Sequence, residues 1–348
     1  MKIAQVAPLF ESVPPKGYGG TERVVSYLTE ELVRQGHEVT LFASGDSVTR
    51  ARLIPAVEHS IRPQIGDQSW LAYHTIQMDL VARMAAEFDV IHFHTDYLHF
   101  PLAESLRIPH VTTMHGRLDL PEQVPVFRRF TNCPLVSISD NQRQPLPNAN
   151  WYATVHHGLP PDLYSCRAKA GGYFVFIGRV SREKRLDRAI DIAERCGTRL
   201  YIAAKVDKAD EPFFNECIKP LLGLPMVEFI GEVGEREKRE LLEGASALLF
   251  PIDWPEPFGL VMIEAFCCGT PVVAYRCGSV PEVMEDGVTG FVVDDQEQAV
   301  RAAQAVMTFD RRRCREAFER RFTSAHMAQA YLRVYRNVIE RRAEGGNG

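Results

Sequence analysis

The sequence predicts an α/β protein built from two domains, each a parallel β-sheet with helices on both faces. Short apolar runs alternate with longer segments of helical periodicity along the whole chain, which is the pattern of such sheets. The runs fall into two sets that are separated near residues 158–161, and 348 residues suffice for two domains of ordinary size. We therefore expect two Rossmann-like domains, over 1–160 and 161–323, followed by a helix over 324–342.

The apolar runs are interpreted as strands. In the first domain they span 2–8, 38–43, 89–93, 109–114, 134–138 and 151–155. In the second domain they span 173–177, 199–203, 226–230, 246–250, 271–275 and 290–293. Helices are expected between most of them, including segments 21–35 and 186–196. The Arg-rich segment 311–321 also contains acidic residues and is expected to form a solvated helix face.

The composition excludes several classes of protein. A net charge of −5 at pH 7 argues against a general nucleic-acid binder. No apolar run approaches the roughly 20 residues that cross a bilayer, and the N-terminus lacks an apolar signal core, so a cytoplasmic location is expected. The eight cysteines include no C-x-x-C pair, which favours reduced thiols and gives a zinc site little support.

The strongest functional signal lies in residues 253–265, Asp-Trp-Pro-Glu-Pro-Phe-Gly-Leu-Val-Met-Ile-Glu-Ala. They follow a predicted buried strand, two prolines prevent regular structure, and a helical pattern begins at Gly259. The first N–H groups of a helix have no internal partners and attract phosphate. The backbone of Phe258, Gly259 and Leu260 is therefore a candidate phosphate site.

Two carboxylates flank this helix start. Glu256 lies in the loop before the helix, and Glu264 lies about one turn into it. A carboxylate accepts hydrogen bonds from two hydroxyls at once, which suits the vicinal diols of ribose or of a hexose. Two glutamates at this spacing alone occur by chance in most chains. Their position around a loop between a strand and a helix favours a ligand site.

This stretch, Glu-x7-Glu with Phe-Gly-Leu inside it, resembles the signature of the retaining glycosyltransferases of family 4. The resemblance implies the GT-B architecture, in which two Rossmann-like domains with parallel sheets face a central cleft and the last helix crosses back onto the first domain. It also implies transfer of a hexose from a nucleotide-sugar donor, bound by the second domain, to an acceptor hydroxyl on the side of the first domain.

The resemblance assigns roles to the acidic residues of the second domain. Glu256 is expected to hold hydroxyls of the sugar, and Glu264 to hold the ribose. The segment around Val233, within Gly231-Glu-Val-Gly234, is expected to hold the base mainly by its backbone.

Two cations of the second domain are candidates for binding the diphosphate. Arg179 and Lys184 match the Gly-Arg…Glu-Lys-Gly motif of the family. A guanidinium binds a diphosphate bidentately, and an ammonium adds a point charge. The alternative is a pair of solvated loop cations. Arg185 replaces the usual glycine, which puts the local turn in doubt.

The first domain contains a glycine-rich loop, residues 17–20, between its first strand and a helix. Glycine lets a backbone approach a ligand closely. The resemblance implies that Gly19 and Gly20 close over the donor diphosphate, and Thr21 is expected to cap the helix. A tight strand-to-helix turn without a ligand is the alternative.

Histidines follow two strands of the first domain. His115 matches the Thr-x-His-Gly motif of the family, in which the histidine faces the donor sugar; a packed histidine at a strand end is the alternative. His94, Asp96 and Arg143 are weaker candidates for the acceptor side, with packing or capping of the sheet as the alternative. The histidines lack ligand spacing, so no metal is expected.

UDP-glucose is the favoured donor, because segment 231–234 offers mainly backbone and Glu232 is the only local carboxylate that could pair with guanine. GDP-mannose is the alternative. Protein cations would hold both phosphates and no D-x-D motif is present, so no divalent metal or other cofactor is expected. The family mechanism is front-face attack, in which the leaving phosphate takes the acceptor proton.

Two other functions are alternatives to glycosyl transfer. One is a nucleotide-sugar epimerase or hydrolase on the same fold, and the other is a non-catalytic nucleotide-sugar-binding protein. The presence of all four residues Arg179, Lys184, Glu256 and Glu264 favours an enzyme. The sequence does not indicate the acceptor or the oligomeric state. Arg128 and Arg129 are weak evidence for a peripheral contact with a membrane.

Overall fold

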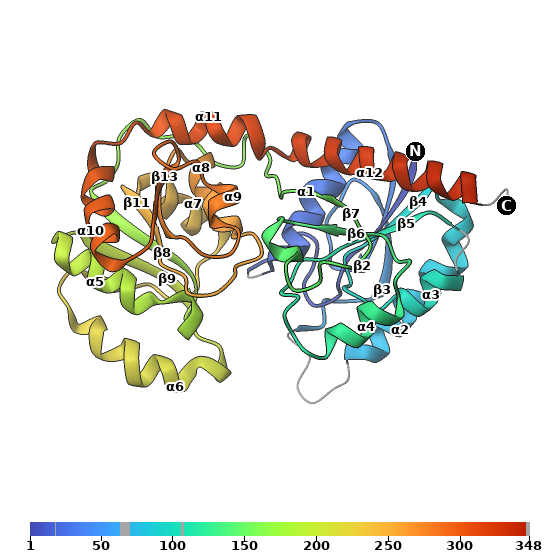
Figure 1. Cartoon of the computed structure of the whole chain (residues 1–348), viewed down its shortest axis with the longest axis horizontal. Coiled ribbons are helices and arrows are strands. Elements are labelled where there is room, and N and C mark those ends of the chain that lie inside the picture. The colour runs from blue at the N-terminus through green and yellow to red at the C-terminus, as the bar shows by residue number, and fades with distance from the viewer. Residues whose placement is uncertain (18, 63–69, 106–107, 346–348) are drawn as a thin grey trace. The chain divides into compact units, whose positions relative to one another are not determined.

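The computed structural model describes residues 1–17, 19–62, 70–105 and 108–345. Tyr18 of the glycine-rich loop and the glycine-containing tail 346–348 lie outside these described residues. The chain forms two compact units (Figure 1). The first unit contains Met1–Pro160 together with Ser324–Gly348, and the second contains Pro161–Thr323.

The first unit is built on a parallel sheet of seven strands in the order β3-β2-β1-β4-β5-β6-β7. Every neighbouring pair is parallel. The strands are β1 (Lys2–Val6), β2 (Glu38–Ser44), β3 (Arg52–Val57), β4 (Val90–Phe93), β5 (His110–Thr113), β6 (Leu135–Ser137) and β7 (Trp151–Thr154).

Strand β3 is absent from the sequence-based prediction, which contains six strands for this domain. Its sequence, Arg-Leu-Ile-Pro-Ala-Val, lies at the edge of the sheet, and none of its residues is fully buried. Pro55 cannot donate a hydrogen bond to a strand ladder, which makes the segment look like a loop, yet an edge strand tolerates it. Only the pairing with β2 identifies this segment as a strand.

Helices cover both faces of this sheet. Figure 1 shows α1 (Gly20–Arg34) and α12 (Ser324–Gly345) on one side and α2 (Trp70–Met84), α3 (Phe100–Ser105) and α4 (Gln123–Arg129) on the other. Short helical turns lie at η2 (Ala85–Glu87) and η3 (Asn141–Arg143). Helix α12 packs beside α1 and contacts β5.

The second unit is built on a parallel sheet of six strands in the order β10-β9-β8-β11-β12-β13. The strands are β8 (Tyr173–Arg179), β9 (Arg199–Lys205), β10 (Val227–Phe229), β11 (Ala247–Phe250), β12 (Val272–Tyr275) and β13 (Gly290–Val293). The helices are α5 (Leu186–Cys196), α6 (Glu211–Phe213), α7 (Glu235–Gly244), α8 (Leu260–Cys267), α9 (Val280–Val283), α10 (Gln296–Ala305) and α11 (Arg311–Arg321). Further helical turns of other types are η4 (Arg182–Lys184), η5 (Lys208–Asp210), η6 (Phe214–Ile218), η7 (Lys219–Gly223) and η8 (Val306–Thr308).

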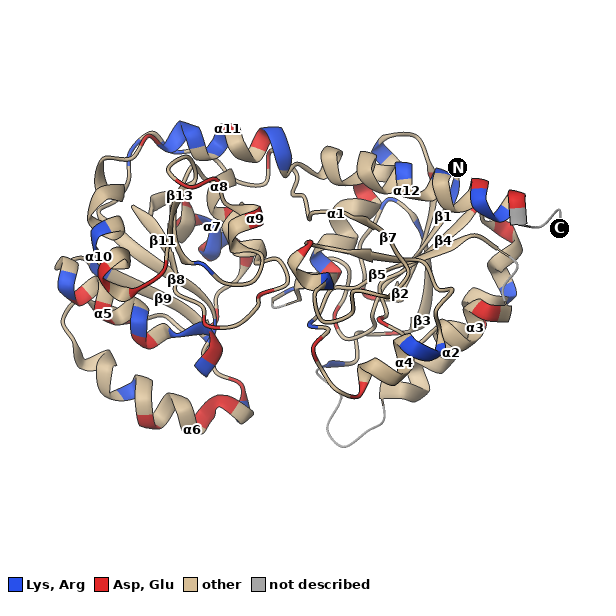
Figure 2. Ribbon diagram, in the orientation of Figure 1, with Lys and Arg blue, Asp and Glu red and all other residues tan. Residues whose placement is uncertain are grey.

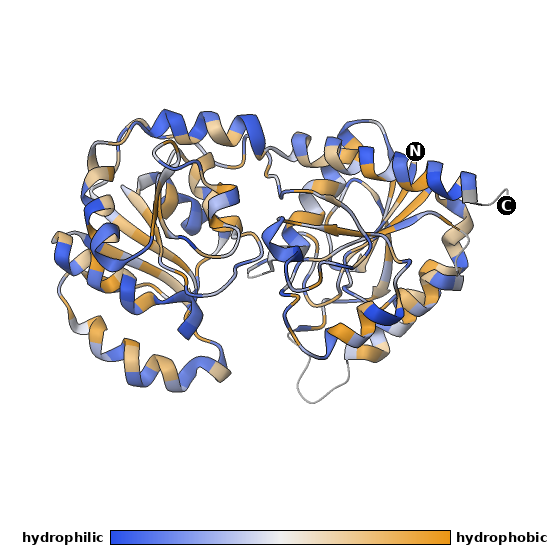
Figure 3. Ribbon diagram, viewed as in Figure 1, coloured by the Kyte–Doolittle hydropathy of each residue, from blue (hydrophilic) through white to orange (hydrophobic). Residues whose placement is uncertain are grey.

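The hydrophobic pattern explains both sheets. Strands buried on two faces read as continuous apolar runs, as in Ala-Leu-Leu-Phe of β11, whose four residues are all buried. Helix α5 instead buries one stripe, including Leu186, Ala189, Ile190 and Ala193, at the spacing of a helix that faces a core. Figure 3 shows hydrophobic strands and helices with hydrophilic faces in each unit. The predicted class, two Rossmann-like α/β domains with parallel sheets, is confirmed.

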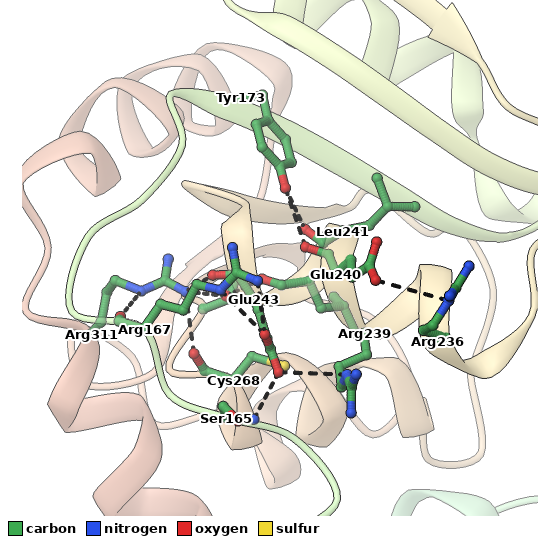
Figure 4. A network of polar contacts seen from close by, with 12 residues as sticks. Ser165, Arg167, Tyr173, Arg236, Arg239, Glu240, Leu241, Glu243, Cys268 and Arg311 are labelled. Carbon is green, nitrogen blue, oxygen red and sulfur yellow. Dashed lines mark hydrogen bonds and ion pairs between the residues drawn. The ribbon is translucent and has the colours of Figure 1, made fainter.

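The predicted solvated face of segment 311–321 is wrong for Arg311. Helix α11 is rich in basic residues (Figure 2), but Arg311 is buried. Its guanidinium donates to the carbonyl oxygens of Arg167 at 2.9 Å, Glu243 at 2.8 Å and Cys268 at 3.2 Å (Figure 4). It also donates to the carbonyl oxygen of Ala245 and to the hydroxyl of Thr270.

These acceptors explain why a buried arginine is stable there. The last carbonyl groups of a helix have no partners within the helix, and a guanidinium carries five N–H donors in a fixed geometry. Arg311 thus binds the C-terminal ends of α7 and α8, and so fixes the two helices that carry Lys238 and Glu264. In the described part of the chain, no helix is long and apolar enough to cross a membrane.

Candidate functional site

The loop between β11 and α8 brings the candidate residues of the second unit to the start of a helix. Gly259 has φ of +78°, a left-handed conformation that a glycine adopts without strain. A Cβ atom at this position would lie 2.8 Å from Cε of Met262. Helix α8 begins at the next residue, Leu260, and Phe258 is buried beside it. The start of α8 therefore agrees with the prediction within one residue.

A second loop holds the backbone of Glu256 in place. The Ser279 N–H donates to the Glu256 carbonyl at 3.0 Å, and the Ser279 hydroxyl donates to the Phe258 carbonyl at 2.9 Å. Gly278 has φ of +57°, and a Cβ there would lie 2.3 Å from the Glu256 nitrogen. The contact with Gly278 therefore leaves no room for a side chain. Ser279 thus binds this loop through both its backbone and its side chain.

The side chains of Glu256 and Lys184 form an ion pair. The indole N–H of Trp254 donates to the same carboxylate at 3.0 Å, and the Lys184 ammonium lies 5.2 Å from the centre of the Trp254 ring. Both partners of the ion pair are largely buried, with 18% and 14% of their side chains exposed. Two predicted residues thus meet directly, and Trp254, which the sequence analysis did not single out, touches both.

Arg179 lies at the end of β8 among carboxylates. Its guanidinium is 3.0 Å from Glu183, 3.4 Å from Asp210 and 3.9 Å from Asp207. Asp207 and Asp210 follow a different strand, β9, so the sequence around Arg179 does not indicate them. Arg179 and Lys184 therefore have separate acidic partners, with which a diphosphate would have to compete.

Arg185 settles the doubt about the turn before α5. Its φ of +53° is the left-handed conformation that the usual glycine would adopt. Its guanidinium binds Asp187 at 2.8 Å and Asp253 at 2.9 Å, and these ion pairs hold it there. The turn is therefore kept without the glycine, and Asp253 joins it to the Glu256 loop.

Glu264 is buried inside α8 and is paired with a residue of α7. The Lys238 ammonium lies 2.7 Å from the Glu264 carboxylate and 3.3 Å from Glu235. The hydroxyl of Tyr164 donates to Glu235 and extends this network. Lys238 was missed because a lysine in a strongly charged helix sequence resembles a solvated residue; only the packing of α7 against α8 reveals it.

Val233 lies half-buried in the loop between β10 and α7. Gly231 adopts φ of +89°, and the Gly234 N–H donates to the Glu237 carboxylate at 2.9 Å, which begins α7. Glu232 is exposed. The loop thus combines a backbone turn with one exposed carboxylate.

In the first unit, the glycine-rich loop leads directly into α1. Gly19 is the residue before the helix, with φ of +152°, and a Cβ there would lie 2.8 Å from Cβ of Pro15. Gly20 is the first helical residue and is exposed. The prediction that Thr21 caps the helix is wrong, because the helix begins before it and no side chain caps its start.

His115 follows β5 and contacts another predicted histidine. Its Nε2 lies 2.9 Å from Nδ1 of His94, whose Nε2 lies 2.8 Å from the amide oxygen of Gln5. The ring of His157 stacks on His115 with centroids 5.4 Å apart. Burial lowers the pKa of His115 to about 3, so the ring is neutral at physiological pH.

The remaining candidates of the first unit have different surroundings. Asp96 is exposed and has φ of +50°, a conformation that aspartate tolerates better than most residues. Arg143 donates from Nε to the Ser137 hydroxyl at 2.7 Å and lies 5.5 Å from the centre of the Trp151 ring. Both contacts are with residues of the first sheet, and the acceptor-side role of Arg143 stays a prediction. Among the described residues, no group of three or more His, Cys, Asp or Glu could hold a metal ion.

Two family models match this chain. The model described as Glycosyltransferase Family 4 matches residues 18–163, and the model described as Glycosyl transferases group 1 matches residues 167–321. Together they span most of the sequence, and the chain belongs to glycosyltransferase family 4. The protein is therefore an enzyme, a glycosyltransferase, and this assignment favours transfer over the epimerase, hydrolase and sensor interpretations.

Similar sequences and solved structures agree with this assignment. The α-maltose-1-phosphate synthase of Mycobacterium tuberculosis is 26% identical over 96% of this chain and 99% of its own length. The sucrose-phosphate synthase of Thermosynechococcus elongatus has a TM-score of 0.80 at 18% identity, covering 98% of this chain and 99% of that chain. Anabaena HepE, solved in complex with UDP-glucose, has a TM-score of 0.73 at 18% identity, covering 97% of this chain and 100% of that chain. The fold is that of the GT-B glycosyltransferases.

Proposed function

We propose that the protein transfers a hexose, with glucose as the first choice, from a UDP-sugar to an acceptor hydroxyl with retention of configuration. The observation that carries this proposal is the ion pair of Lys184 with Glu256 beside the start of α8. It brings a cation and a carboxylate from two loops to the start of a helix, and a cation, a carboxylate and backbone N–H groups are what a nucleotide-sugar requires.

Negative charge on the diphosphate grows as the glycosidic bond breaks. Lys184, Arg179 and the N–H groups at Phe258, Gly259 and Leu260 would stabilise that charge. Groups held in place before the reaction stabilise the transition state more than the ground state, so these contacts accelerate transfer. They would also replace a divalent metal, and we propose that transfer is metal-independent.

The two glutamates would bind different parts of the donor. Glu256 would accept hydrogen bonds from sugar hydroxyls after releasing Lys184 to the phosphates. Glu264, deeper in α8, would accept hydrogen bonds from the ribose, and the Val233 loop would meet the base. From the first unit, we propose that Gly19 and Gly20 approach the diphosphate and that His115 faces the sugar.

The choice of glucose follows from the geometry expected for Glu256 and the N–H groups beside it. Together they suit the equatorial 3- and 4-hydroxyls of glucose, and an axial 4-hydroxyl, as in galactose, would meet the carboxylate at a different angle. A site that pairs a hydroxyl discriminates strongly against a misplaced one. Anabaena HepE shows a protein of this fold in complex with UDP-glucose.

A thermal-shift comparison of donors tests the proposal. UDP and UDP-glucose should raise the melting temperature in the presence of EDTA, since a ligand that binds only the native state stabilises it. UDP-galactose, UDP-N-acetylglucosamine and GDP-mannose serve as comparisons. A clear preference for GDP-mannose would overturn the donor, and a strict requirement for Mg²⁺ or Mn²⁺ in transfer would overturn the metal-independent site.

Acceptors are then screened with the best donor, and the anomeric configuration of the product tests retention. The mycobacterial relative is a maltose-1-phosphate synthase, so sugar phosphates are the first acceptors to test. Hydrolysis of the donor without transfer to any acceptor would count against the proposed reaction.

A further inference from the structure

A continuous chain of buried hydrogen bonds leads from helix α12 to His115 within the first unit. The Gln5 amide nitrogen donates to the Tyr335 hydroxyl at 3.0 Å. The amide oxygen of Gln5 lies 2.8 Å from Nε2 of His94, and Nδ1 of His94 lies 2.9 Å from Nε2 of His115. Gln5 and Tyr335 are fully buried, and His94 is 2% exposed.

The direction of this chain fixes the position of each proton. An amide oxygen only accepts, so His94 must carry a hydrogen on Nε2. In a neutral imidazole the other nitrogen then has a lone pair, so Nδ1 of His94 accepts a hydrogen bond. The donor of that hydrogen bond is His115, whose proton therefore resides on Nε2.

The free end of the chain supports the same direction. Nδ1 of His115 is buried and has no hydrogen-bond partner among the described residues. A buried N–H without an acceptor is rarer in proteins than an under-satisfied acceptor. A lone pair on this atom is therefore the less costly choice. A second proton would create an unpaired N–H there, in agreement with the lowered pKa of this ring.

The other branch from Tyr335 is consistent with this direction. Its hydroxyl accepts from Gln5 and so is free to donate to Nδ1 of His92, 2.7 Å away. Nε2 of His92 then carries the hydrogen and donates to the Thr113 hydroxyl at 2.7 Å. Every bond in the chain thus has one donor and one acceptor.

We propose that Gln5 and His94 are positioning residues that hold His115 as the neutral tautomer with its proton on Nε2. The inference rests on the proposed function only where it gives His115 a place near the donor sugar. In this state His115 carries no charge and cannot donate from Nδ1. It is then neither a general acid nor a counter-charge for the leaving phosphate, which leaves that task to Lys184 and Arg179.

The tautomer is measured directly by long-range ¹H–¹⁵N NMR on the full chain with ¹⁵N-labelled histidine. His115→Gln and His94→Gln assign the two resonances. His115 should show protonated Nε2 and unprotonated Nδ1 from about pH 8 to about pH 5, without titrating. A proton on Nδ1, or a titration midpoint inside this range, would overturn the proposal, and neither result depends on any activity.

Gln5→Glu tests whether Gln5 sets the tautomer. A carboxylate at this position favours the imidazolium form of His94, whose Nδ1–H would then face Nε2 of His115 and move the proton of His115 to Nδ1. We expect the NMR signature to switch, and kcat at pH 7 to fall about tenfold and become pH-dependent. An unchanged tautomer in a folded Gln5→Glu protein would refute the role of Gln5.

His99→Gln is the matched control. His99 is also fully buried in this unit, but it bonds to Thr112 at 2.7 Å and stacks on Phe93, outside the chain. Its substitution should lower stability and leave the His115 tautomer and the pH profile unchanged. If no UDP-sugar is turned over by the wild type, the proposed donor fails while the NMR result still decides the tautomer.

Discussion

At the scale of single residues, the ion pair of Glu256 with Lys184 should affect the relative affinities for the proposed ligands. The carboxylate neutralises the cation that we propose binds the diphosphate, and in the same proposal sugar hydroxyls offer the carboxylate another partner. A nucleoside diphosphate alone supplies no such partner. The pair should therefore weaken binding of UDP, the product of the proposed reaction, more than binding of the proposed sugar donor.

Glu256→Gln tests this consequence. The substitution removes the charge that competes for Lys184, so UDP should bind at least as tightly as to the wild type, while kcat falls about 100-fold. Titration calorimetry and transfer kinetics measure the two effects. Asp253→Asn, in the same loop but paired with Arg185, is the control and should change neither as strongly. Loss of UDP binding in Glu256→Gln would contradict the competition.

Lys184→Ala and Arg179→Ala test stabilisation of the leaving group. In the proposed mechanism each removes a contact that strengthens as negative charge develops, so kcat should fall by about 100-fold and more than the donor KM rises. Steady-state kinetics with the best donor separates the two constants. If Arg179→Ala changed KM alone, Arg179 would not stabilise the leaving group, and its main role would be the ion pairs with its carboxylate partners.

At the scale of elements, the Glu256 loop depends on the neighbouring loop at Gly278. Gly278→Ala should lower both the melting temperature and kcat, because the new Cβ meets the Glu256 backbone and the left-handed conformation becomes strained. Gly287→Ala is the matched control: its φ is +72°, but nothing lies within 4 Å of the added atom.

Both variants strain a left-handed backbone, but only Gly278→Ala also adds a clash with the Glu256 backbone. The difference between their stabilities therefore measures the effect of that clash. We expect Gly287→Ala to cost about 1–2 kcal/mol of stability and to keep kcat, and Gly278→Ala to cost about 3 kcal/mol or more. Equal effects in unfolding and kinetics would show that the contact does not position Glu256.

The pair of helices α7 and α8 gives a further prediction. Lys238→Met leaves the Glu264 carboxylate buried without its closest cation, which should cost about 3 kcal/mol of unfolding free energy. Lys238→Met combined with Glu264→Gln should recover most of that loss, since no buried charge is left unpaired. Additive losses in the double variant would mean that the two residues are not coupled.

At the scale of the whole molecule, buried histidines should make stability depend on pH. Burial lowers the pKa of eight described histidines of the first unit, namely His37, His74, His92, His94, His99, His110, His115 and His157. Below about pH 6.5 the unfolded chain binds protons that the native state does not bind, so the free energy of unfolding falls as the pH is lowered. Glu22, whose pKa burial raises to about 7, acts in the opposite direction.

The expected loss is about 1.4 kcal/mol per pH unit for each histidine that stays neutral. Chemical denaturation at about pH 7.5 and about pH 5.5 measures it, and His99→Gln should reduce the slope by the share of one histidine. A stability that is flat or rises toward low pH would contradict the neutral state of these rings.

Much of the fold was predictable from local sequence. Buried parallel strands read as unbroken apolar runs, so β11 and β12 were recognised, and α5 was predicted with its observed bounds because one face carries a regular apolar stripe. The edge strand β3 was missed, since half-exposed residues and Pro55 produce no such run. Likewise, the Glu-x7-Glu stretch was recognisable because prolines and a glycine mark its loop and the start of α8.

The sequence by itself determined the class of the fold, the family, and which loops carry candidate residues, because these follow from hydrophobic periodicity and from local motifs. Only the tertiary structure decided which charges meet: Lys184 with Glu256, Lys238 with Glu264, and Arg311 with the ends of two helices. It also joined Gln5, His94 and His115 across neighbouring strands. Such partners are distant in the chain, and their contacts depend on side-chain directions that only packing establishes, so no local pattern records them.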